Sequence, residues 1–368
     1  MSVGKQTVKF SVFADFHYMK QCYPVTQAHL DAVLRRAVDE KADFVVQLGD
    51  FCNDFIVSPE ITKYYTDNPY KLPAYGVYGG HDLEYVEHSG KSLPRDNTMA
   101  RVTPYLNSDK DVIWGTEDGT IGDGSIGYYY FDKGGFRFIA VDSQYSQNPE
   151  TGEWVKNITY HPPQGNKFGD RLGTKQLAWL ETVLTDAAHK DLPCIIFAHS
   201  PAWHGYAVAD KEPEVTAIFN RVNAIRKGTV MMCLNGHLHT NRAMKLLDNV
   251  LYMDVNATIN AWWMGSKAKP HYGPEHTYEY TEYDAEGNPI GTRERPYIEL
   301  WQGQNTWFVK DPLSAIVTVD TDGNVTVQGM ETEWVYDIAP ELPEDAYFAK
   351  EFVHCAPCIS SGEYKIER

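Results

Sequence analysis

Apolar runs and helical patterns alternate along the first two thirds of the chain. Predominantly apolar runs at 8–14 and 43–48 are typical of buried strands, whereas apolar residues recur at helical spacing in 26–40 and 174–189. Further strands are predicted at 74–78, 193–198, 230–234 and 250–255, and a further helix at 214–226. Alternating strands and helices predict an α/β fold whose helices cover the outside of a sheet.

The helix expected at 26–40 has one apolar face, and Thr26 can cap its N-terminus. That face is formed by Ala28, Val33, Leu34, Ala37 and Val38. We expect these side chains to pack against the sheet.

Two antiparallel hairpins are expected in addition. Strands at 128–131 and 136–141 flank an Asp-Lys-Gly-Gly turn sequence. Strands at 315–319 and 324–328 flank an Asp-Thr-Asp-Gly turn sequence. Asp and Gly favour the tight turns that join neighbouring antiparallel strands.

The chain becomes less regular after residue 260. The segment 261–310 is rich in aromatic, Gly, Pro and charged residues, and we expect an insertion near the mouth of a site, with a small hairpin at 285–288. Residues 1–338 are expected to form one domain. Residues 339–368 are expected to form a C-terminal tail that packs on this domain or is partly disordered.

Five polar clusters follow strand-like runs. They are Asp15-Phe16-His17, Gly49-Asp50-Phe51-Cys52-Asn53, Gly79-Gly80-His81-Asp82, His199-Ser200-Pro201 and Gly236-His237-Leu238-His239. Carboxylate oxygens and imidazole nitrogens suit divalent metals, and crevices form at the carboxyl ends of strands in such sheets. One cluster alone would be weak evidence, but five together predict a metal site. The glycines Gly49, Gly79 and Gly236 are expected to let the chain turn sharply away from each strand.

Composition narrows the partners. A formal net charge of −17 argues against a nucleic-acid polymer as partner, because a protein that binds one needs a basic face. The same charge argues against binding to an anionic membrane surface. No run reaches the roughly 20 apolar residues of a membrane helix. Localisation stays open: cytoplasmic by default, and secreted or periplasmic if an upstream signal peptide had been removed. The oligomeric state is equally open.

The six cysteines are scattered along the chain. Cys194 and Cys233 lie in apolar runs, so we expect buried free thiols there. Cys355 and Cys358 form a single CxxC pair, which is weak evidence for a disulfide, a redox pair or a metal site.

The order and content of the five clusters resemble the calcineurin-like metallophosphoesterase superfamily, over roughly residues 8 to 260. The resemblance implies a four-layer α/β/β/α sandwich. It also implies two divalent metal ions, which could be Mn, Fe, Zn or Mg. Metal one would take Asp15, His17, Asp50 and His239, while Asp50 would bridge to metal two, which would also take His199 and His237.

The same resemblance gives a catalytic role to His81 and Asp82. His81 would lie beside the substrate phosphate and protonate the leaving oxygen, and Asp82 would orient it. The metals would supply a hydroxide for in-line attack on phosphorus. Softer candidates for the pocket are Asn53, His204, Tyr18, Trp203, Trp262 and Trp263.

Gly80 departs from the family pattern, which has Asn before the catalytic His. The family Asn gives its side-chain oxygen to metal two, so the second site is expected to be weak or to be completed by water, a main-chain carbonyl, or a group such as Asn53, Asp54 or His88.

We therefore expect a metal-dependent phosphoester hydrolase acting on a small phosphodiester or a nucleotide-like substrate. Asp54 stands where protein Ser/Thr phosphatases have Arg, which disfavours that class. One alternative is a phosphomonoesterase. Another is a non-catalytic binding protein with this fold, weakened at the second metal by Gly80.

Overall fold

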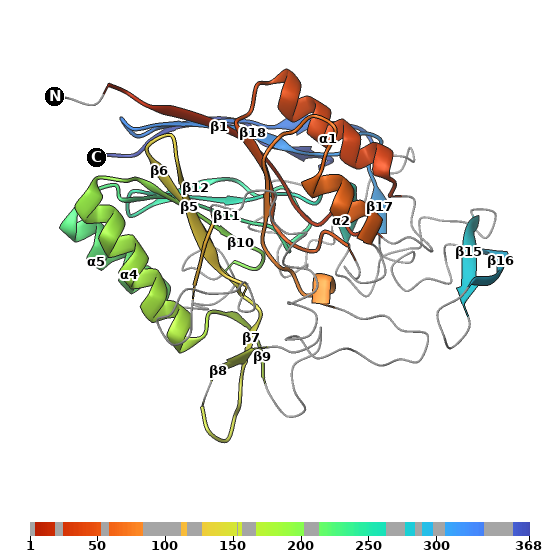
Figure 1. Cartoon of the computed structure of the whole chain (residues 1–368), viewed down its shortest axis with the longest axis horizontal. Coiled ribbons are helices and arrows are strands. Elements are labelled where there is room, and N and C mark those ends of the chain that lie inside the picture. Colours follow the sequence, from red (N-terminus) through yellow and green to blue (C-terminus); the bar gives the residue numbers. More distant parts are fainter. Residues whose placement is uncertain are drawn as a thin grey trace.

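The structure of the chain is a computed structural model. It describes residues 4–18, 25–52, 59–83, 112–115, 127–152, 154–156, 167–201, 213–262, 277–283, 289–296, 306–334 and 356–368. Two large sheets lie face to face in these residues, and helices cover their outer sides (Figure 1).

The first sheet has six strands in the order β22-β19-β18-β1-β2-β3. They are β22 (Gly362–Lys365), β19 (Asn324–Gln328), β18 (Ala315–Asp320), β1 (Thr7–Phe13), β2 (Phe44–Gln47) and β3 (Ala74–Gly76). The neighbours β1, β2 and β3 run parallel, so their carboxyl ends share one edge. The pairs β1/β18, β18/β19 and β19/β22 are antiparallel, which makes the sheet mixed.

The second sheet has seven strands in the order β12-β13-β11-β10-β6-β5-β4. They are β12 (Lys245–Leu247), β13 (Val250–Asp254), β11 (Val230–Asn235), β10 (Cys194–Ala198), β6 (Phe136–Ala140), β5 (Tyr129–Lys133) and β4 (Ile113–Trp114). Its central strands β6, β10, β11 and β13 run parallel. The β5/β6 and β18/β19 hairpins confirm the two antiparallel turns predicted from the sequence.

An aromatic layer joins the two sheets. The ring of Phe10 on β1 lies 5.7 Å from that of Phe138 on β6 and 5.8 Å from that of Phe197 on β10. The ring of Phe44 on β2 lies 4.9 Å from that of Phe138. All four side chains are buried, and each contributes about 1.5–3 kcal/mol through removal of apolar surface from water. This layer fixes how the strand ends of one sheet face those of the other.

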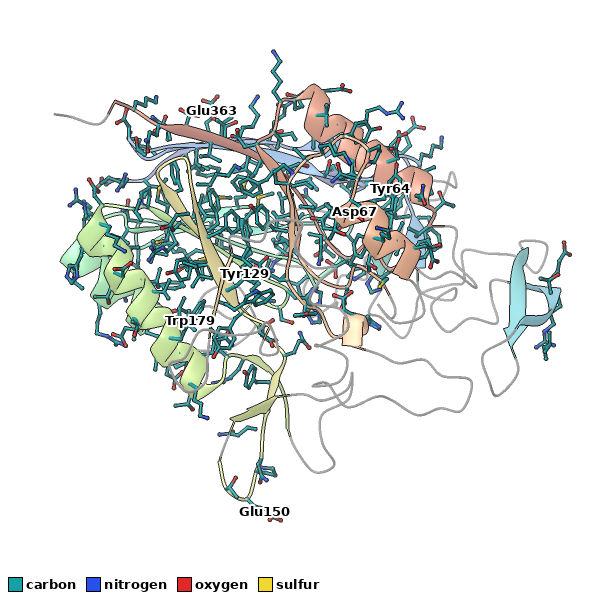
Figure 2. All side chains as sticks on the ribbon, viewed as in Figure 1. Tyr64, Asp67, Tyr129, Glu150, Trp179 and Glu363 are labelled. Atoms are coloured by element: carbon teal, nitrogen blue, oxygen red, sulfur yellow. The ribbon has the colours of Figure 1, made fainter. Side chains whose placement is uncertain are left out.

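Tyr129 adds a polar link inside this layer (Figure 2). Its hydroxyl donates to the carbonyl of Gly76 at 2.7 Å and accepts the Gly76 N–H at 3.2 Å. The start of β5 in the second sheet is thereby tied to the end of β3 in the first.

Helices form the outer layers. The first sheet is covered by α1 (Gln27–Asp39) and α2 (Pro59–Thr66), and the second by α4 (Thr174–Lys190) and α5 (Pro213–Ile225) (Figure 1). Apolar side chains of α4 and α5 share a core with Ile139 and Ile196 of the second sheet. The α/β/β/α order confirms the fold class expected from the sequence.

The apolar face of α1 differs in detail from the prediction. Val33, Leu34 and Ala37 are buried as expected, and Leu30 joins them. Ala28 is exposed because it lies on the side of the helix opposite this buried face, and Val38 is 37% exposed because it lies at the margin of the face.

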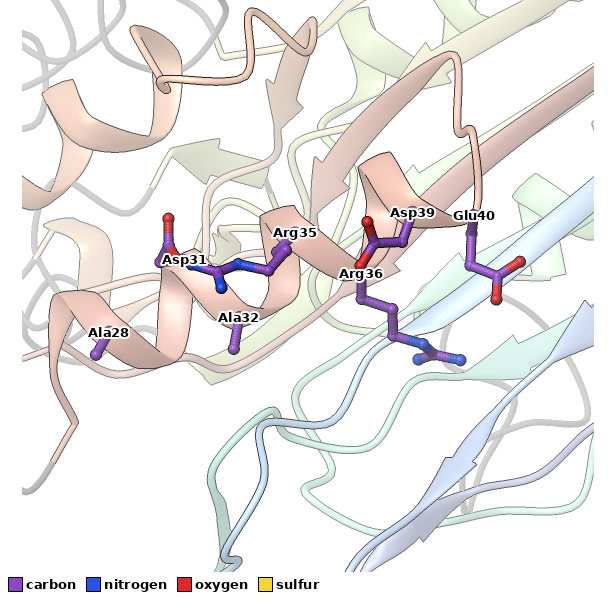
Figure 3. Close-up of a pocket in the computed structure, with 7 residues that line it drawn as sticks. All are labelled: Ala28, Asp31, Ala32, Arg35, Arg36, Asp39 and Glu40. Atoms are coloured by element: carbon purple, nitrogen blue, oxygen red, sulfur yellow. Dashed lines mark hydrogen bonds and ion pairs between the residues drawn. The ribbon is translucent and has the colours of Figure 1, made fainter.

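A shallow depression runs along the outer side of α1, lined by residues between Ala28 and Glu40 (Figure 3). Arg35 pairs there with Asp31 across one helical turn, at 2.7 Å. It contains none of the residues of the five polar clusters.

Smaller elements complete the described chain. They are the sheets β14 (Asn260–Trp262)/β17 (Thr306–Phe308), β15 (Thr277–Tyr283)/β16 (Pro289–Pro296), β20 (Met330–Glu331)/β21 (Cys358–Ile359) and β8 (Trp154–Lys156)-β7 (Tyr145–Gln147)-β9 (Lys167–Arg171). The β15/β16 pair confirms the small hairpin expected within 261–310. No helix in the described residues is long and apolar enough to cross a membrane.

The described end of the C-terminal tail packs on the core. Strand β22 closes one edge of the first sheet. The side chain of Asn241 donates from Nδ2 to Ser360 Oγ at 2.9 Å and accepts the Ser360 N–H at 3.1 Å. The division into a domain of 1–338 and a tail of 339–368 stays a prediction.

Candidate metal centre

The polar clusters meet where parallel strands of both sheets end. Three follow β1, β2 and β3 of the first sheet, and two follow β10 and β11 of the second. The residues whose nitrogen or oxygen atoms lie within 4.8 Å of one another form three overlapping groups. These groups are Asp15/His17/His239, His17/Asp50/His81 and Asp50/His199/His237. All six candidate metal ligands and His81 therefore lie in one place, although they come from distant parts of the chain.

Asp50 lies at the centre of this arrangement. Its Oδ2 atom is 3.1 Å from His199 Nε2 and 3.8 Å from His17 Nε2. Its other oxygen, Oδ1, accepts the backbone N–H of His81 at 2.8 Å. One carboxylate oxygen thus faces imidazoles from both sides of the site, as a carboxylate shared between two cations must.

The first group is close-packed around Asp15 and His239. His239 Nε2 lies 3.2 Å from Asp15 Oδ1 and 3.1 Å from His17 Nε2. In the third group, Asp50/His199/His237, the rings of His199 and His237 have centroids 5.0 Å apart. His237 is only partly buried, whereas the other five candidate ligands are at most 3% exposed.

The site fits cations rather than a purely hydrogen-bonded cluster. His199 Nδ1 lies 2.8 Å from the Leu48 carbonyl, which places the proton on Nδ1 and leaves the lone pair of Nε2 facing Asp50. Among the described residues, His199 Nε2 and Asp15 Oδ1 are buried without a hydrogen bond of good geometry. Two imidazole nitrogens 3.1 Å apart, at His17 and His239, likewise share at most one proton. Cations between these lone pairs would satisfy them.

Five of the six candidate ligands have left-handed backbone conformations. The φ angles are 51° at Asp15, 50° at His17, 48° at Asp50, 74° at His237 and 51° at His239. Residues other than glycine adopt this region at a cost of about 1–3 kcal/mol, and such residues cluster at functional sites. The spacing of these residues gave no sign of this strain.

Hydrogen bonds between the clusters hold the strained loops. The N–H of Asp15 donates to the Gly49 carbonyl at 3.0 Å, and that of His237 to Asp15 Oδ2 at 2.9 Å. The N–H of Gly236 donates to the His199 carbonyl at 3.0 Å. With the His199–Leu48 contact, these bonds close a ring that joins the loops of both sheets.

The three glycines act in two different ways. Gly49 has φ of +87°, so it makes the sharp turn predicted for it. Gly79 and Gly236 instead allow close approach: a Cβ on Gly79 would lie 2.7 Å from Asp50 Cγ, and one on Gly236 would lie 2.6 Å from Asp15 Oδ2. Neither has a positive φ, so the expected conformational role is replaced at these two positions by a steric one.

Burial and charge set the protonation of the metal-free cluster. Burial lowers the pKa of His17 to about 3. Burial also opposes protonation of His199, but the Asp50 carboxylate prevails and raises the pKa of His199 to about 10. Burial alone would raise the pKa of Asp50, yet the facing imidazole of His199 holds it well below its usual range. Without a cation, the Asp50 carboxylate therefore favours a protonated His199, and a cation that bound to Nε2 would have to displace that proton.

His81 and Asp82 begin a short 3₁₀ helix, η1 (His81–Leu83), and are buried. Asp82 Oδ1 accepts the backbone N–H of Phe51 at 2.8 Å and of Cys52 at 3.1 Å, and Oδ2 accepts that of Gly79 at 2.8 Å. Burial raises the pKa of Asp82 to about 8, against the pull of these donors. Asp82 thus ties the second cluster to the third through the backbone.

The structure also shows polar residues that the sequence motifs did not single out. Ser143 follows β6, and its Oγ accepts the N–H of Ser200 at 3.1 Å. Asn235 and Asp254 end β11 and β13 and are buried side by side. All three lie at or just after the end of an apolar strand, as the five clusters do, and this position in the sequence could have identified them.

The softer candidates are placed only in part. Tyr18 is half-buried and its hydroxyl donates to Glu60 at 3.4 Å. Burial, with the nearby Glu60 carboxylate, raises the pKa of Tyr18 to about 12. Outside the described residues lie Asn53, Asp54, His88, Trp203, His204, Trp263, Cys22 and Cys355. Cys194 and Cys233 are buried free thiols, as predicted.

A two-sheet α/β sandwich with histidines and aspartates at its strand ends defines a class of metal-dependent hydrolases. The calcineurin-like phosphoesterase family model matches residues 8–241. The chain therefore belongs to the calcineurin-like phosphoesterase family, whose members are metal-dependent phosphoester hydrolases.

One solved structure supports this fold at low sequence identity, and a second is similar to a lesser degree. A dimetal phosphatase from Danio rerio is 14% identical with a TM-score of 0.50, over 89% of this chain and 98% of that chain. A phosphopantetheinyl hydrolase from Mycobacterium tuberculosis is 12% identical with a TM-score of 0.34, over 68% of this chain and 89% of that chain. A search of curated proteins found no match to the sequence.

Proposed function

We propose that the chain hydrolyses a small phosphodiester or a nucleotide-like phosphoester at a centre for two divalent cations. The observation that carries the proposal is the position of Asp50 Oδ2, 3.1 Å from His199 Nε2 and 3.8 Å from His17 Nε2. This arrangement suits a carboxylate shared by two cations about 3.5–4 Å apart, as in two-metal hydrolases.

We assign Asp15, His17 and His239 to one cation, and His199 and His237 to the other. When bound, Mn, Fe, Zn or Mg at these positions would act as Lewis acids and lower the pKa of bound water. Gly80 contributes no side chain, so the second cation has fewer protein ligands than the family pattern provides.

His81 is proposed to donate a proton to the leaving oxygen of the ester. Its imidazole lies beside the ligand set, with its ring centroid 5.0 Å from that of His17. Its backbone N–H is held by Asp50 Oδ1. Asp82 accepts hydrogen bonds from three backbone N–H groups and so holds the loop that carries His81. We therefore propose that Asp82 orients His81 through this loop.

A small substrate is favoured over a polymer by charge. The formal net charge of −17 opposes the approach of a polyanion. A single phosphoester can still bind, because two cations would dominate the local field.

The proposal is tested with metal-free protein, reloaded separately with manganese, iron, zinc or magnesium. Bis(p-nitrophenyl) phosphate, p-nitrophenyl phosphate and a nucleoside diphosphate are compared, with Asp50→Asn as the control for contaminating enzymes. We expect hydrolysis that depends on metal and is lost in Asp50→Asn, with the diester or the nucleotide hydrolysed faster than the simple monoester.

Each other result points elsewhere. Faster hydrolysis of p-nitrophenyl phosphate would identify a phosphomonoesterase. Tight metal binding without hydrolysis of any ester would favour the non-catalytic binding protein that Gly80 suggests. Failure to bind any of the four metals would refute the proposed centre.

A further inference from the structure

Asn235 and Asp254 form a buried polar pair behind the last metal-ligand cluster. They are the final residues of the parallel neighbours β11 and β13 and lie opposite each other in the register. Asn235 is 0% exposed and Asp254 is 2% exposed. A buried amide and carboxyl are costly to desolvate unless they are paired, so their presence here needs an explanation.

The pair holds the backbone from which the ligands project. Asn235 Nδ2 donates to Asp254 Oδ1 at 2.7 Å and to the carbonyl of Gly236 at 3.0 Å. Asp254 therefore fixes the Asn235 amide, and the amide fixes the first peptide of the Gly236–His239 loop.

This peptide is directly joined to a candidate ligand of each cation. The next residue, His237, has φ of 74°, and its N–H donates to Asp15 Oδ2 at 2.9 Å. A rotation of the Gly236 peptide would thus displace His237 and release Asp15 together. The β13 backbone adds a second tie, because the N–H of Val255 donates to the Asn235 carbonyl at 2.7 Å.

We propose that Asn235 and Asp254 are positioning residues that hold the Gly236–His239 loop in its metal-binding conformation. The inference rests on the proposed two-cation centre. Since Asp15 and His237 are assigned to different cations, loss of the pair is expected to weaken both sites, whereas the missing side chain at Gly80 concerns only the second.

The test is the titration of metal-free protein with manganese, followed by calorimetry. Asn235→Ala and Asp254→Ala remove the same hydrogen bond from its two ends. Asp254→Asn keeps an oxygen acceptor for Asn235 and serves as the conservative variant. Loss of a partner that supports a ligand typically weakens metal binding about 10–100-fold. We expect such a loss at both sites in the two alanine variants, and affinity within about threefold of wild type in Asp254→Asn, which retains that partner.

Asn68→Ala is the matched control. Asn68 is 1% exposed and hydrogen-bonds the backbone of Tyr65 and Leu72 in the turn between α2 and β3. Neither of these two residues belongs to a polar cluster. It should lower the melting temperature by circular dichroism as much as the test variants do, yet leave manganese affinity unchanged.

The outcomes separate the two proposals. Wild-type protein that binds no manganese would reject the two-cation centre and the positioning role with it. Wild-type binding that persists unchanged in both alanine variants would reject the positioning role alone. An equal loss in Asn68→Ala would show that general destabilisation explains the effect, and would also reject it. If one alanine variant does not fold, the other probes the same hydrogen bond.

Discussion

Replacement of Gly79 by alanine should damage metal binding at both cation sites. A Cβ at this position would lie 2.7 Å from Asp50 Cγ and closer still to the Oδ1 and backbone N atoms of Asp50. Asp50 cannot easily move aside, because its Oδ1 atom accepts the N–H of His81 at 2.8 Å. Gly79 is fixed as well, since its own N–H donates to Asp82 Oδ2 at 2.8 Å.

The size of the effect follows from the geometry. Relief of the clash requires Asp50 Cγ to move by at least about 0.7 Å, from 2.7 Å to the 3.4 Å of an ordinary contact, and the closer Oδ1 atom to move further. Metal–ligand distances tolerate about ±0.2 Å, so the shared carboxylate would leave both cations. We expect manganese affinity to fall at least about 100-fold, the upper end of what loss of a supporting partner causes. Overpacking should also cost about 1–3 kcal/mol of stability.

The neighbouring glycine provides the control. Gly80 is partly exposed and its backbone is not in the left-handed region, so Gly80→Ala should be tolerated. Both variants are dialysed with manganese, analysed for metal content, titrated by calorimetry and melted by circular dichroism. If Gly79→Ala binds two equivalents with wild-type affinity, the close approach between Gly79 and Asp50 does not govern the site, and the reasoning fails.

Three further predictions concern the second cation and the acid. Gly80→Asn should raise the metal content after dialysis, because it adds a ligand of the family pattern; unchanged content would show that this position does not limit the second site. In the folded protein the pKa of His199 is about 10, above its ordinary value of 6.5. Protonation of His199 therefore contributes fully to the stability of the metal-free protein below pH 6.5, and this contribution is lost as the pH rises through 10. Metal binding must release that proton, so calorimetry in buffers of different ionisation enthalpy should show about one proton released near pH 7, and none would contradict the assignment. His81→Ala should slow turnover about 10²–10⁴-fold, and less for nitrophenyl esters, because nitrophenolate leaves readily without protonation. Equal losses of turnover on all esters would exclude the acid role of His81. A loss of bound metal in this variant would identify His81 as a metal ligand instead.

The fold could be predicted because the parallel strands at the centre of its sheets are buried. Apolar runs such as 44–46 and 194–198 mark strands that are covered on both faces. Polar residues directly after such runs lie at strand ends. Because the strands that precede the five clusters run parallel within each sheet, the clusters were expected to meet at the edge that holds their carboxyl ends. The limits of the buried helix face were harder to predict, since Ala28 lies on the far side of α1 from the sheet and Val38 lies at the margin of the contact.

The finer structure of the site could not be predicted from residue spacing. The orienting role of Asp82 stays a prediction, and the hydrogen bonds of its carboxylate to three backbone donors depend on loop paths that no motif specifies. The supporting pair of Asn235 and Asp254 was equally hidden, because its members lie on different strands and meet only through the register of the sheet. Such contacts are properties of the assembled edge and not of any one segment.

The left-handed ligands and the bonds between their loops have one physical cause. Each strained residue costs about 1–3 kcal/mol, and a domain has only about 5–15 kcal/mol of net stability, so five of them persist only where neighbours hold them. The carbonyls of Leu48, Gly49 and His199 and the carboxylate of Asp15 supply these restraints as hydrogen-bond acceptors. Each of these bonds has at one of its ends a candidate ligand or a residue next to one. The two-sheet scaffold therefore sets the geometry of the candidate ligands, and we expect substitutions in these loops to be detected first as changes in metal affinity.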